Sequence, residues 1–303
     1  MQNKSNRKVI VRISGGLGNQ LFSYAAARRL ALLNDAELVI DNVTGFIRDY
    51  QYQRKYSLNH FQIPVRLATA AERLEPFERF RRGLWRNFSK RKSFFNRPYL
   101  CQEQPDFDQR LLNFKVKGTL YLEGYWQSEN YFRDVENVIR KDLQITPPAD
   151  PENLSLAKKI KLSPAVALHI RIFDNINLSS LNNIRPLYYK NAIENIEKLQ
   201  PGCHFYIFCE NYEVARSIIS LPENRVTYVA NNIDASKAYA DLWLMTLCDH
   251  FVVANSTFSW WGAWLGAKNE NSIVIAPERE IYESVAWWGF KGLIPERWIK
   301  CTD

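Results

Sequence analysis

Runs of β-branched and aliphatic residues alternate along the chain with stretches whose apolar residues recur every three or four positions. The first run, Val9 to Ile13, predicts a strand, and the glycine-rich loop after it leads into a predicted helix over 19–33, rich in Ala and Leu. Further elements predicted before residue 150 are strands over 38–40 and 119–122 and a helix over 128–143, with Ser128 as its N-cap. This part of the chain therefore predicts an α/β unit.

Beyond residue 150, predicted strands and helices alternate regularly with short connections. The strands are expected over 165–169, 204–208, 226–229, 250–254 and 272–276, and the helices over 187–199, 211–220, 236–248 and 258–267. Such alternation is typical of a doubly wound, mostly parallel sheet. Ligands bind such sheets at the carboxyl ends of strands, where the strand order reverses.

The segment over 145–152 contains Pro147, Pro148 and Pro151 and cannot continue a helix, so its composition predicts a hinge. It separates a predicted domain over 1–150 from one over 151–303. The length of 303 residues fits two domains, and the average composition, 46% hydrophobic and 24% charged, excludes disordered, collagenous and coiled-coil classes.

Positive charge is concentrated in the first third of the chain. Residues 1–100 hold 19 Lys and Arg against 7 Asp and Glu, whereas the remainder holds 21 against 25. Between Arg66 and Arg97, apolar residues recur at helical spacing among Arg and Lys, namely Leu67, Leu74, Phe77, Phe80, Leu84 and Phe88. This pattern predicts a basic amphipathic helix, which either is an ordinary solvated surface helix or contacts anionic lipid or an anionic acceptor. The second predicted domain is net acidic, which argues against nucleic-acid binding.

Cysteine usage and the N-terminus point to a cytoplasmic protein. The five cysteines lack any Cys-x-x-Cys spacing, and the four histidines are scattered, so neither a disulfide framework nor a metal site is predicted. The apolar run near the N-terminus is shorter than the core of a signal peptide or a membrane span.

A glycine loop, GGLGNQ over 15–20, joins the first strand to the first helix. With Gly15, Gly16 and Gly18 it lets backbone amides and the helix N-terminus approach an anion or a sugar. A purely structural tight turn explains the glycines equally well.

A second candidate is ALHIRIFDN, over 167–175, which places His169 and Arg171 two residues apart where a strand leaves the sheet. Arg171 offers a planar fork to phosphate oxygens, and His169 can bond a ribose or a base. The alternative is a structural salt bridge between Arg171 and Asp174.

A third candidate, NSTFSWWGAWLG over 255–266, opens a helix with the hydroxyls of Ser256, Thr257 and Ser259. Its outward-pointing free amides predict a phosphate-ready helix N-terminus. The Trp260, Trp261 and Trp264 cluster favours core packing over ligand stacking. Earlier in the chain, Asp241 opens DLWLM and is either an ordinary helix-start acid or an acceptor for a guanine ring.

Six ordered blocks resemble the bacterial α1,2-fucosyltransferases of glycosyltransferase family eleven, with the match running from about residue 9 to about 277. They are GGLGNQLFSYAAARRLA (15–31), YSLNHFQI (56–63), GYWQSENYF (124–132), HIRIFD (169–174), YYKNAI (188–193) and DLWLMTLCDHFVVANSTFSWWGAWL (241–265). The resemblance implies a two-domain GT-B-like fold whose Rossmann-like C-terminal domain binds GDP-fucose. It also implies inverting α1,2 transfer of fucose to a galactoside without metal or cofactor, the acceptor being a galactose-terminated oligosaccharide or a lipid-linked glycan.

The resemblance also implies residue roles. Arg171 would hold the β-phosphate of GDP beside His169, Asp241 would read guanine, Asn19 would face the reaction centre, and the turn at Ser256, Thr257 and Phe258 would wrap the diphosphate. Ile172 and Phe173 replace a second Arg and a Gly of the family pattern, and Cys209 and Glu210 replace Ser and Asp.

Two further functions stay open: a transferase for another GDP-sugar or linkage, and an inactive sugar-nucleotide sensor. Asp106 and Asp108 form an Asp-x-Asp pair that could be mistaken for a metal motif, but they lie away from the nucleotide strands and lack partner ligands.

Overall fold

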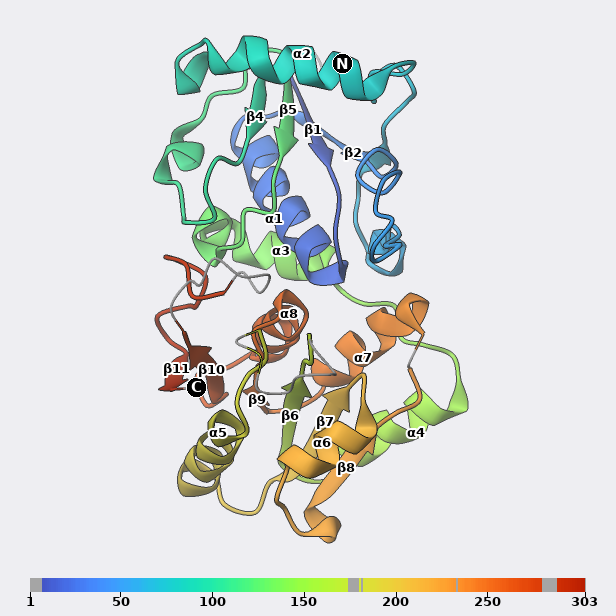
Figure 1. Ribbon diagram of the computed structural model, residues 1–303, viewed down its shortest axis with the longest axis vertical. Helices are drawn as coiled ribbons and strands as arrows, with labels where there is room; N and C mark the ends of the chain where they lie inside the picture. The colour runs from blue at the N-terminus through green and yellow to red at the C-terminus, as the bar shows by residue number, and fades with distance from the viewer. Residues whose placement is uncertain (1–6, 174–179, 181, 233, 280–287, 303) are drawn as a thin grey trace. The chain divides into compact units, whose positions relative to one another are not determined.

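The computed structural model describes residues 7–173, 180, 182–232, 234–279 and 288–302, and the chain forms two compact units (Figure 1). The first comprises Met1–Gln144 with Lys291–Leu293, and the second comprises Ile145–Phe290 with Ile294–Asp303. The boundary that the prolines predict, after residue 150, therefore falls inside the second unit.

The first unit is built on a five-stranded parallel sheet in the order β3-β2-β1-β5-β4. Its strands are β1 (Lys8–Arg12), β2 (Glu37–Asp41), β3 (Arg66–Leu67), β4 (Tyr99–Cys101) and β5 (Thr119–Glu123). The central strand β1 pairs with β2 on one side and β5 on the other, so the strand order reverses at β1. The sequence pattern predicted β1, β2 and β5 and missed the two short edge strands.

Among the described residues, three α-helices accompany this sheet. They are α1 (Leu17–Leu33), which packs on β1, α2 (Glu78–Lys90), which lies against β4, and α3 (Glu136–Asp142). The helix predicted over 128–143 is wrong in its first half, which forms two short 3-10 turns, Glu129–Tyr131 and Arg133–Val135. Phe132 leaves the helical conformation because its ring is buried beside Phe22, with centroids 6.4 Å apart. Ser128 still caps the first turn, where its hydroxyl accepts from the N–H of Asn130.

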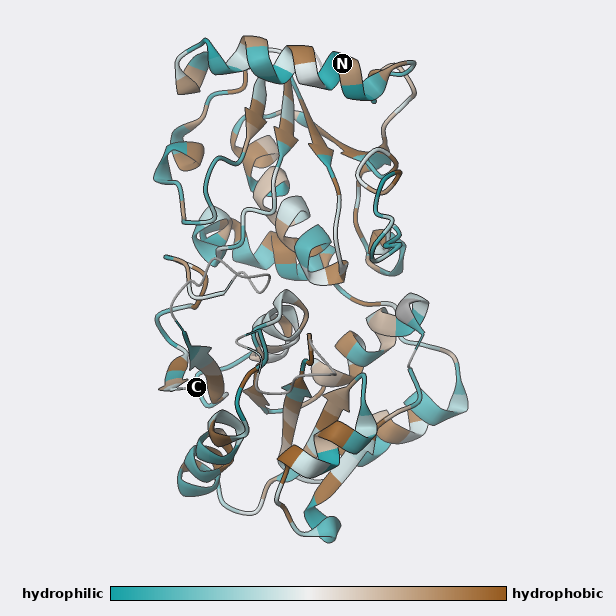
Figure 2. Ribbon diagram, viewed as in Figure 1, coloured by the Kyte–Doolittle hydropathy of each residue, from teal (hydrophilic) through white to brown (hydrophobic). Residues whose placement is uncertain are grey.

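The second unit holds a six-stranded parallel sheet in the order β11-β10-β9-β6-β7-β8. Its strands are β6 (Ala165–Ile170), β7 (His204–Cys209), β8 (Val226–Val229), β9 (His250–Val252), β10 (Val274–Glu278) and β11 (Ile299–Thr302). All six residues of β6 are buried, and Figure 2 shows that the strands of this sheet are largely hydrophobic. Such continuous burial is expected of a parallel sheet covered on both faces.

The helices of the second unit are α4 (Pro151–Ile160), α5 (Pro186–Leu199), α6 (Tyr212–Ile218), α7 (Ala238–Met245) and α8 (Thr257–Gly266). Only α4 and the edge strand β11 were missed by the sequence pattern. Pro151, taken there as part of a hinge, is the first residue of α4, where its missing N–H costs nothing. Asp150 caps this helix by accepting from the N–H of Asn153.

Candidate active site

In the second unit, the carboxyl end of β6 is the point at which the strand order reverses. Strand β6 pairs with β7 on one side and β9 on the other, so the connections leave in opposite directions and open a crevice there. His169 belongs to β6, and Arg171 follows its last residue, Ile170. Both predicted residues therefore lie where a parallel sheet of this kind binds ligands.

His169 is buried, and its ring lies 5.6 Å from the ring of Phe258, measured between centroids. Burial, together with the charge of Arg171, lowers the pKa of His169 to about 3, so the imidazole is neutral at physiological pH. Its Nδ1 atom has no hydrogen-bond partner among the described residues. A buried polar atom without a hydrogen bond destabilises the folded protein unless a ligand or a water molecule supplies the missing partner.

Arg171 forms an ion pair with Glu210, and its guanidinium lies 5.1 Å from the ring centre of Phe173. The register explains the pair: Ile170 is opposite Cys209, and Arg171 and Glu210 each come next after these strand ends. Glu210 is one of the positions that depart from the family pattern. The alternative partner Asp174 lies outside the described residues.

Asp241 is in the first turn of α7, where its carboxylate accepts a hydrogen bond of 2.7 Å from Asn232. Asn232 is itself held by a 2.9 Å bond to Asn153 of α4. Burial raises the pKa of Asp241 to about 7, against the lowering effect of Asn232. An acid at the start of a helix that only complements the dipole would be exposed and ionised, so Asp241 is a perturbed group of the kind found at functional sites.

Cys209 lies near both of these carboxylates. Burial, assisted by the charges of Asp241 and Glu210, raises the pKa of the Cys209 thiol to about 11. The thiol is therefore protonated and unreactive at neutral pH. Asp241, Cys209 and Glu210 thus gather at the end of β7, beside the end of β6.

The N-terminus of α8 differs in part from the expectation. Instead of pointing outward, the N–H of Ser256 donates to the carbonyl of Ala254 at 2.7 Å, and the N–H of Phe258 donates to the Ser256 hydroxyl at 3.3 Å. Ser256 is the N-cap, and its hydroxyl satisfies one of the amides that a helix leaves open at its start, that of Phe258. The hydroxyl of Ser259 is buried and bonds within the same turn.

The tryptophans of α8 belong to the core, as the sequence favoured. Trp260, Trp261 and Trp264 are fully buried, and they pack on one another and on Trp298 with centroids 5.1–6.2 Å apart. This aromatic cluster anchors α8 and so fixes the position of its first turn.

In the first unit, the glycine loop lies at the carboxyl end of the switch strand β1. Gly15 has a φ of +75°, and a Cβ atom there would lie 2.9 Å from Nδ2 of Asn19 and 3.0 Å from the hydroxyl of Tyr125. Asn19 accepts a hydrogen bond of 2.8 Å from Gln127. The loop therefore needs a glycine at this position, both for its backbone and for the close approach of these side chains.

The other glycines of the loop are less constrained. Gly16 is the N-cap of α1 with open space around it, and Gly18 is buried in the first turn. Gln20 anchors the loop by donating to the carbonyls of Gly15 and Lys55, both at 2.9 Å. Tyr125 and Gln127, which lie beside Asn19, have no distinctive spacing, although both fall in the block over 124–132.

Asp106 and Asp108 serve the structure of the first unit. Asp106 accepts from the N–H of Lys291 at 2.9 Å, and Asp108 caps a 3-10 turn and pairs with Arg110. Within the ranges that the structure describes, no three His, Cys, Asp or Glu side chains gather into a possible metal site.

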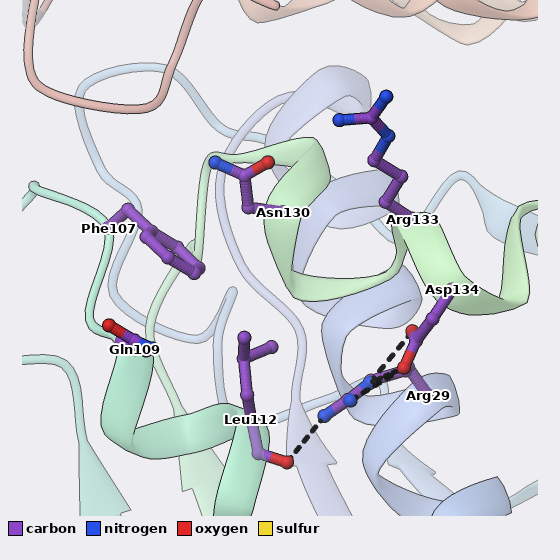
Figure 3. A pocket seen from close by; sticks show the side chains of 7 residues that line it. All are labelled: Arg29, Phe107, Gln109, Leu112, Asn130, Arg133 and Asp134. Atoms are coloured by element: carbon purple, nitrogen blue, oxygen red, sulfur yellow. Dashed lines mark hydrogen bonds and ion pairs between the residues drawn. The ribbon is translucent and has the colours of Figure 1, made fainter.

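An open pocket of about 570 Å³ lies elsewhere on the first unit and contains none of the predicted site residues (Figure 3). Its lining is Arg29, Phe107, Gln109, Leu112, Asn130, Arg133 and Asp134. Arg29 donates to both carboxylate oxygens of Asp134 and to the carbonyl of Leu112, so each of its three nitrogens already donates a hydrogen bond within the protein. We therefore do not assign the active site to this pocket.

Two parallel α/β sheets, each with a candidate ligand site at the strand where its order reverses, define a GT-B-like glycosyltransferase fold. A mutant of Arabidopsis thaliana FUT1 in complex with GDP shares this fold, with a TM-score of 0.53 and 16% identity over 88% of this chain and 70% of that one. So does the fucosyltransferase NodZ from Bradyrhizobium, with a TM-score of 0.50 and 15% identity over 85% and 92%.

The model of glycosyl transferase family 11 matches residues 8–284, and the chain belongs to this family. It is 32% identical to the O-antigen biosynthesis glycosyltransferase WbnK of Escherichia coli, over 88% of this chain and 93% of that protein. It is also 27% identical to an α1,2-colitosyltransferase of Escherichia coli, over 96% and 98%. The family resemblance predicted from the sequence motifs is thereby confirmed.

None of the helices in the described part of the chain combines the length and the apolar character needed to cross a bilayer.

Proposed function

We propose that the protein transfers L-fucose from GDP-β-L-fucose to the 2-hydroxyl of a galactoside, with inversion, and forms an α1,2 linkage in a surface glycan. The observation that carries this proposal is the group of side chains at the ends of β6 and β7: a guanidinium, a neutral buried imidazole and a partly buried carboxylate. These are the partners that a diphosphate, a ribose hydroxyl and a guanine ring require.

In the proposed reaction, the bond between the sugar C1 and the β-phosphate oxygen breaks while the acceptor hydroxyl oxygen attacks from the opposite face and releases its proton to solvent water. Negative charge then grows on the departing GDP, and Arg171 stabilises it once the diphosphate displaces Glu210. The first turn of α8 assists through its helix dipole. Preorganised donors at a site of developing charge can supply the largest part of the rate enhancement without a metal.

Asp241 is proposed to accept from N1–H and N2–H of guanine. The ionised carboxylate can accept both hydrogen bonds. In the protonated carboxyl, by contrast, the O–H donor would face one of the guanine N–H donors. Asn232 holds the carboxylate in place with a bond that persists in either protonation state. Asn19, with Gln127 behind it, is proposed to contact the reacting sugars from the first unit.

The acceptor is proposed to be a galactose-terminated oligosaccharide or a lipid-linked glycan. The Escherichia coli protein WbnK, named for O-antigen biosynthesis, supports an acceptor of this class.

A second donor has a specific observation in its favour, because one relative is named an α1,2-colitosyltransferase. Purified protein should therefore be given GDP-fucose or GDP-colitose with a β-galactoside such as lactose, and GDP release and product linkage measured. Turnover with GDP-fucose and an α1,2 product by NMR supports the proposal. A preference for GDP-colitose would identify GDP-colitose as the donor in place of GDP-fucose. Tight binding of GDP-fucose without turnover or hydrolysis would favour the inactive sugar-nucleotide sensor.

A further inference from the structure

Helix α2 packs on the first sheet through its polar side, and its apolar side faces away from the sheet. Trp85 stands on Tyr121 with ring centroids 4.9 Å apart, Ser89 is buried, and Arg86 lies 3.9 Å from Glu123. Arg82 has a buried Nη1 atom on the same side, where burial lowers the pKa of its guanidinium. The contact with the sheet is therefore made by polar residues and a single aromatic ring.

The apolar residues that the sequence pattern places on one helical stripe face the solvent. Phe77, Phe80, Leu84 and Phe88 recur at three- and four-residue steps and are 76%, 68%, 55% and 52% exposed, respectively. Figure 2 shows hydrophobic and hydrophilic residues alternating along α2. An amphipathic helix in a folded domain normally buries such a stripe, so an outward stripe marks an interaction surface.

This apolar stripe is set among positive charges. The segment over 77–92 contains seven Lys and Arg residues and a single acid, Glu78. Arg79, Arg81, Lys90 and Arg91 are exposed. Lys92 extends over the Phe88 ring, with its ammonium 4.7 Å from the ring centre. Cations that flank large apolar side chains on one exposed helix are the arrangement that inserts into the surface of an anionic bilayer.

We propose that α2 is a membrane-surface helix that binds anionic phospholipid. Phe77, Phe80, Leu84 and Phe88 enter the boundary between headgroups and acyl chains, and the flanking Arg and Lys residues contact lipid phosphates. Binding through α2 does not depend on which donor the enzyme uses. It would bring the first unit to the surface where a lipid-linked acceptor resides.

Charge favours a bilayer over a second copy of the chain as the occupant of this face. Pairing two α2 stripes would bring both sets of cations together, with one acid on each side to offset them. An anionic lipid surface instead supplies a counter-charge for each cation and an apolar layer for the stripe.

The test is sedimentation of the full chain with vesicles of equal parts phosphatidylglycerol and phosphatidylcholine, compared with phosphatidylcholine alone. We expect binding to the anionic vesicles at about 50 mM salt and a loss of at least ~10-fold at about 500 mM, where the Debye length is much shorter. Phe80→Ser with Phe88→Ser should weaken partitioning at least ~10-fold by removing buried apolar area. Arg79→Gln with Lys90→Gln and Arg91→Gln should weaken it about 100-fold, about fivefold for each cation.

Matched control variants carry equivalent changes on exposed residues of the second unit. Leu162→Ser, at a side chain 82% exposed, controls for lost apolar surface. Lys158→Gln with Lys161→Gln and Lys198→Gln controls for lost net charge. Circular dichroism and the thermal midpoint verify that each variant is folded.

Wild-type protein that stays in the supernatant with anionic vesicles at low salt would overturn the proposal. Equal losses in the α2 variants and their controls would also overturn it. A concentration-dependent dimer in ultracentrifugation, abolished by the Phe variant and unaccompanied by vesicle binding, would assign the stripe to self-association instead.

Discussion

Arg171 and Glu210 form an ion pair across the ends of two neighbouring parallel strands. The side chain of Arg171 is only 19% exposed, whereas that of Glu210 is 65% exposed. The carboxylate can therefore swing away into water while the guanidinium stays in place. We therefore expect an anionic ligand to displace Glu210 by competing for the same donor.

Glu210→Gln should therefore tighten GDP binding by about three- to tenfold, because it removes an anion that competes for Arg171 and repels the diphosphate. Isothermal titration calorimetry measures the change. Glu213→Gln, at an exposed position in the first turn of α6, is the matched control and should leave the affinity unchanged. Weaker binding in the Glu210 variant would mean that the carboxylate positions Arg171 for its ligand.

Arg171→Lys should reduce kcat/KM by ~10² to 10³ although the charge is kept, because an ammonium cannot present two parallel donors to a diphosphate. Steady-state GDP release provides the measurement, with circular dichroism as the check on folding. Turnover at the wild-type rate would remove Arg171 from the mechanism.

The proposed role of Asp241 predicts that GDP binding depends on pH. With its pKa raised to about 7 in the free protein, the carboxylate is ionised above that value and protonated below it. GDP affinity should therefore fall as pH decreases through 7, approaching tenfold per pH unit, because binding to the ionised form must expel a proton. Asp241→Asn should bind GDP weakly at every pH between 6 and 8 and show no such slope. A wild-type slope in the variant would assign the titration to another group.

The same substitution should stabilise the protein without ligand. The pKa of Asp241 is higher in the folded protein than in the unfolded chain, so the carboxyl is harder to ionise when the protein is folded. The folded state therefore loses stability as pH rises from about 4 through 7. At pH 8 the buried charge is present in full, so Asp241→Asn should raise the free energy of unfolding by about 1–3 kcal/mol. At pH 4 the two proteins should unfold at similar temperatures.

Activity should survive EDTA within about twofold, because the charge on the departing diphosphate is assigned to Arg171 and α8. The assay compares chelator-treated protein with and without added Mn²⁺ or Mg²⁺. Complete loss that manganese restores would require a metal site. It would direct attention to Asp106 and Asp108 despite their structural bonds.

Gly15→Ala tests the glycine loop against the neighbouring Gly16→Ala. An alanine at residue 15 must adopt a φ of +75° and push against Asn19 and Tyr125, so kcat/KM should fall at least ~10-fold and stability by about 1–2 kcal/mol. Gly16 is extended, with open space around it, and its substitution should be nearly neutral. GDP affinity should be the same in both variants. Equal activity of the Gly15→Ala and Gly16→Ala variants would mean that the loop is only a structural turn.

The elements that the sequence predicted best are those whose pattern is dictated by burial on both sides. Strands β1, β6 and β7 are runs of aliphatic and aromatic residues because helices cover both faces of the sheets. The edge strands β3 and β4 have only two and three residues, and the edge strand β11 is mostly exposed, so none of them shows such a pattern. Helix α4 was missed because Pro151 was taken as a breaker, whereas a proline in the first turn begins a helix.

The sequence predicted which residues would stand in the candidate site, but not which side chains they would contact. His169, Arg171 and Asp241 stand at strand or helix ends that the pattern located. Glu210 as the partner of Arg171 could not be found, because it depends on the register between β6 and β7. The solvent-facing stripe of α2 was likewise beyond the sequence, since helical spacing defines a stripe and tertiary packing decides which way it faces.

Strand β6 is paired along both edges and buried throughout. It therefore gives the candidate site a rigid part within the strand and a more mobile part beyond its end. Its amides should exchange with deuterium only when the whole unit unfolds, so the backbone at His169 should be among the slowest to exchange. Arg171 comes after the last ladder bond and is held chiefly by a carboxylate in water. The proposed ligand would therefore meet a fixed imidazole and a guanidinium whose exposed carboxylate partner can move away from it.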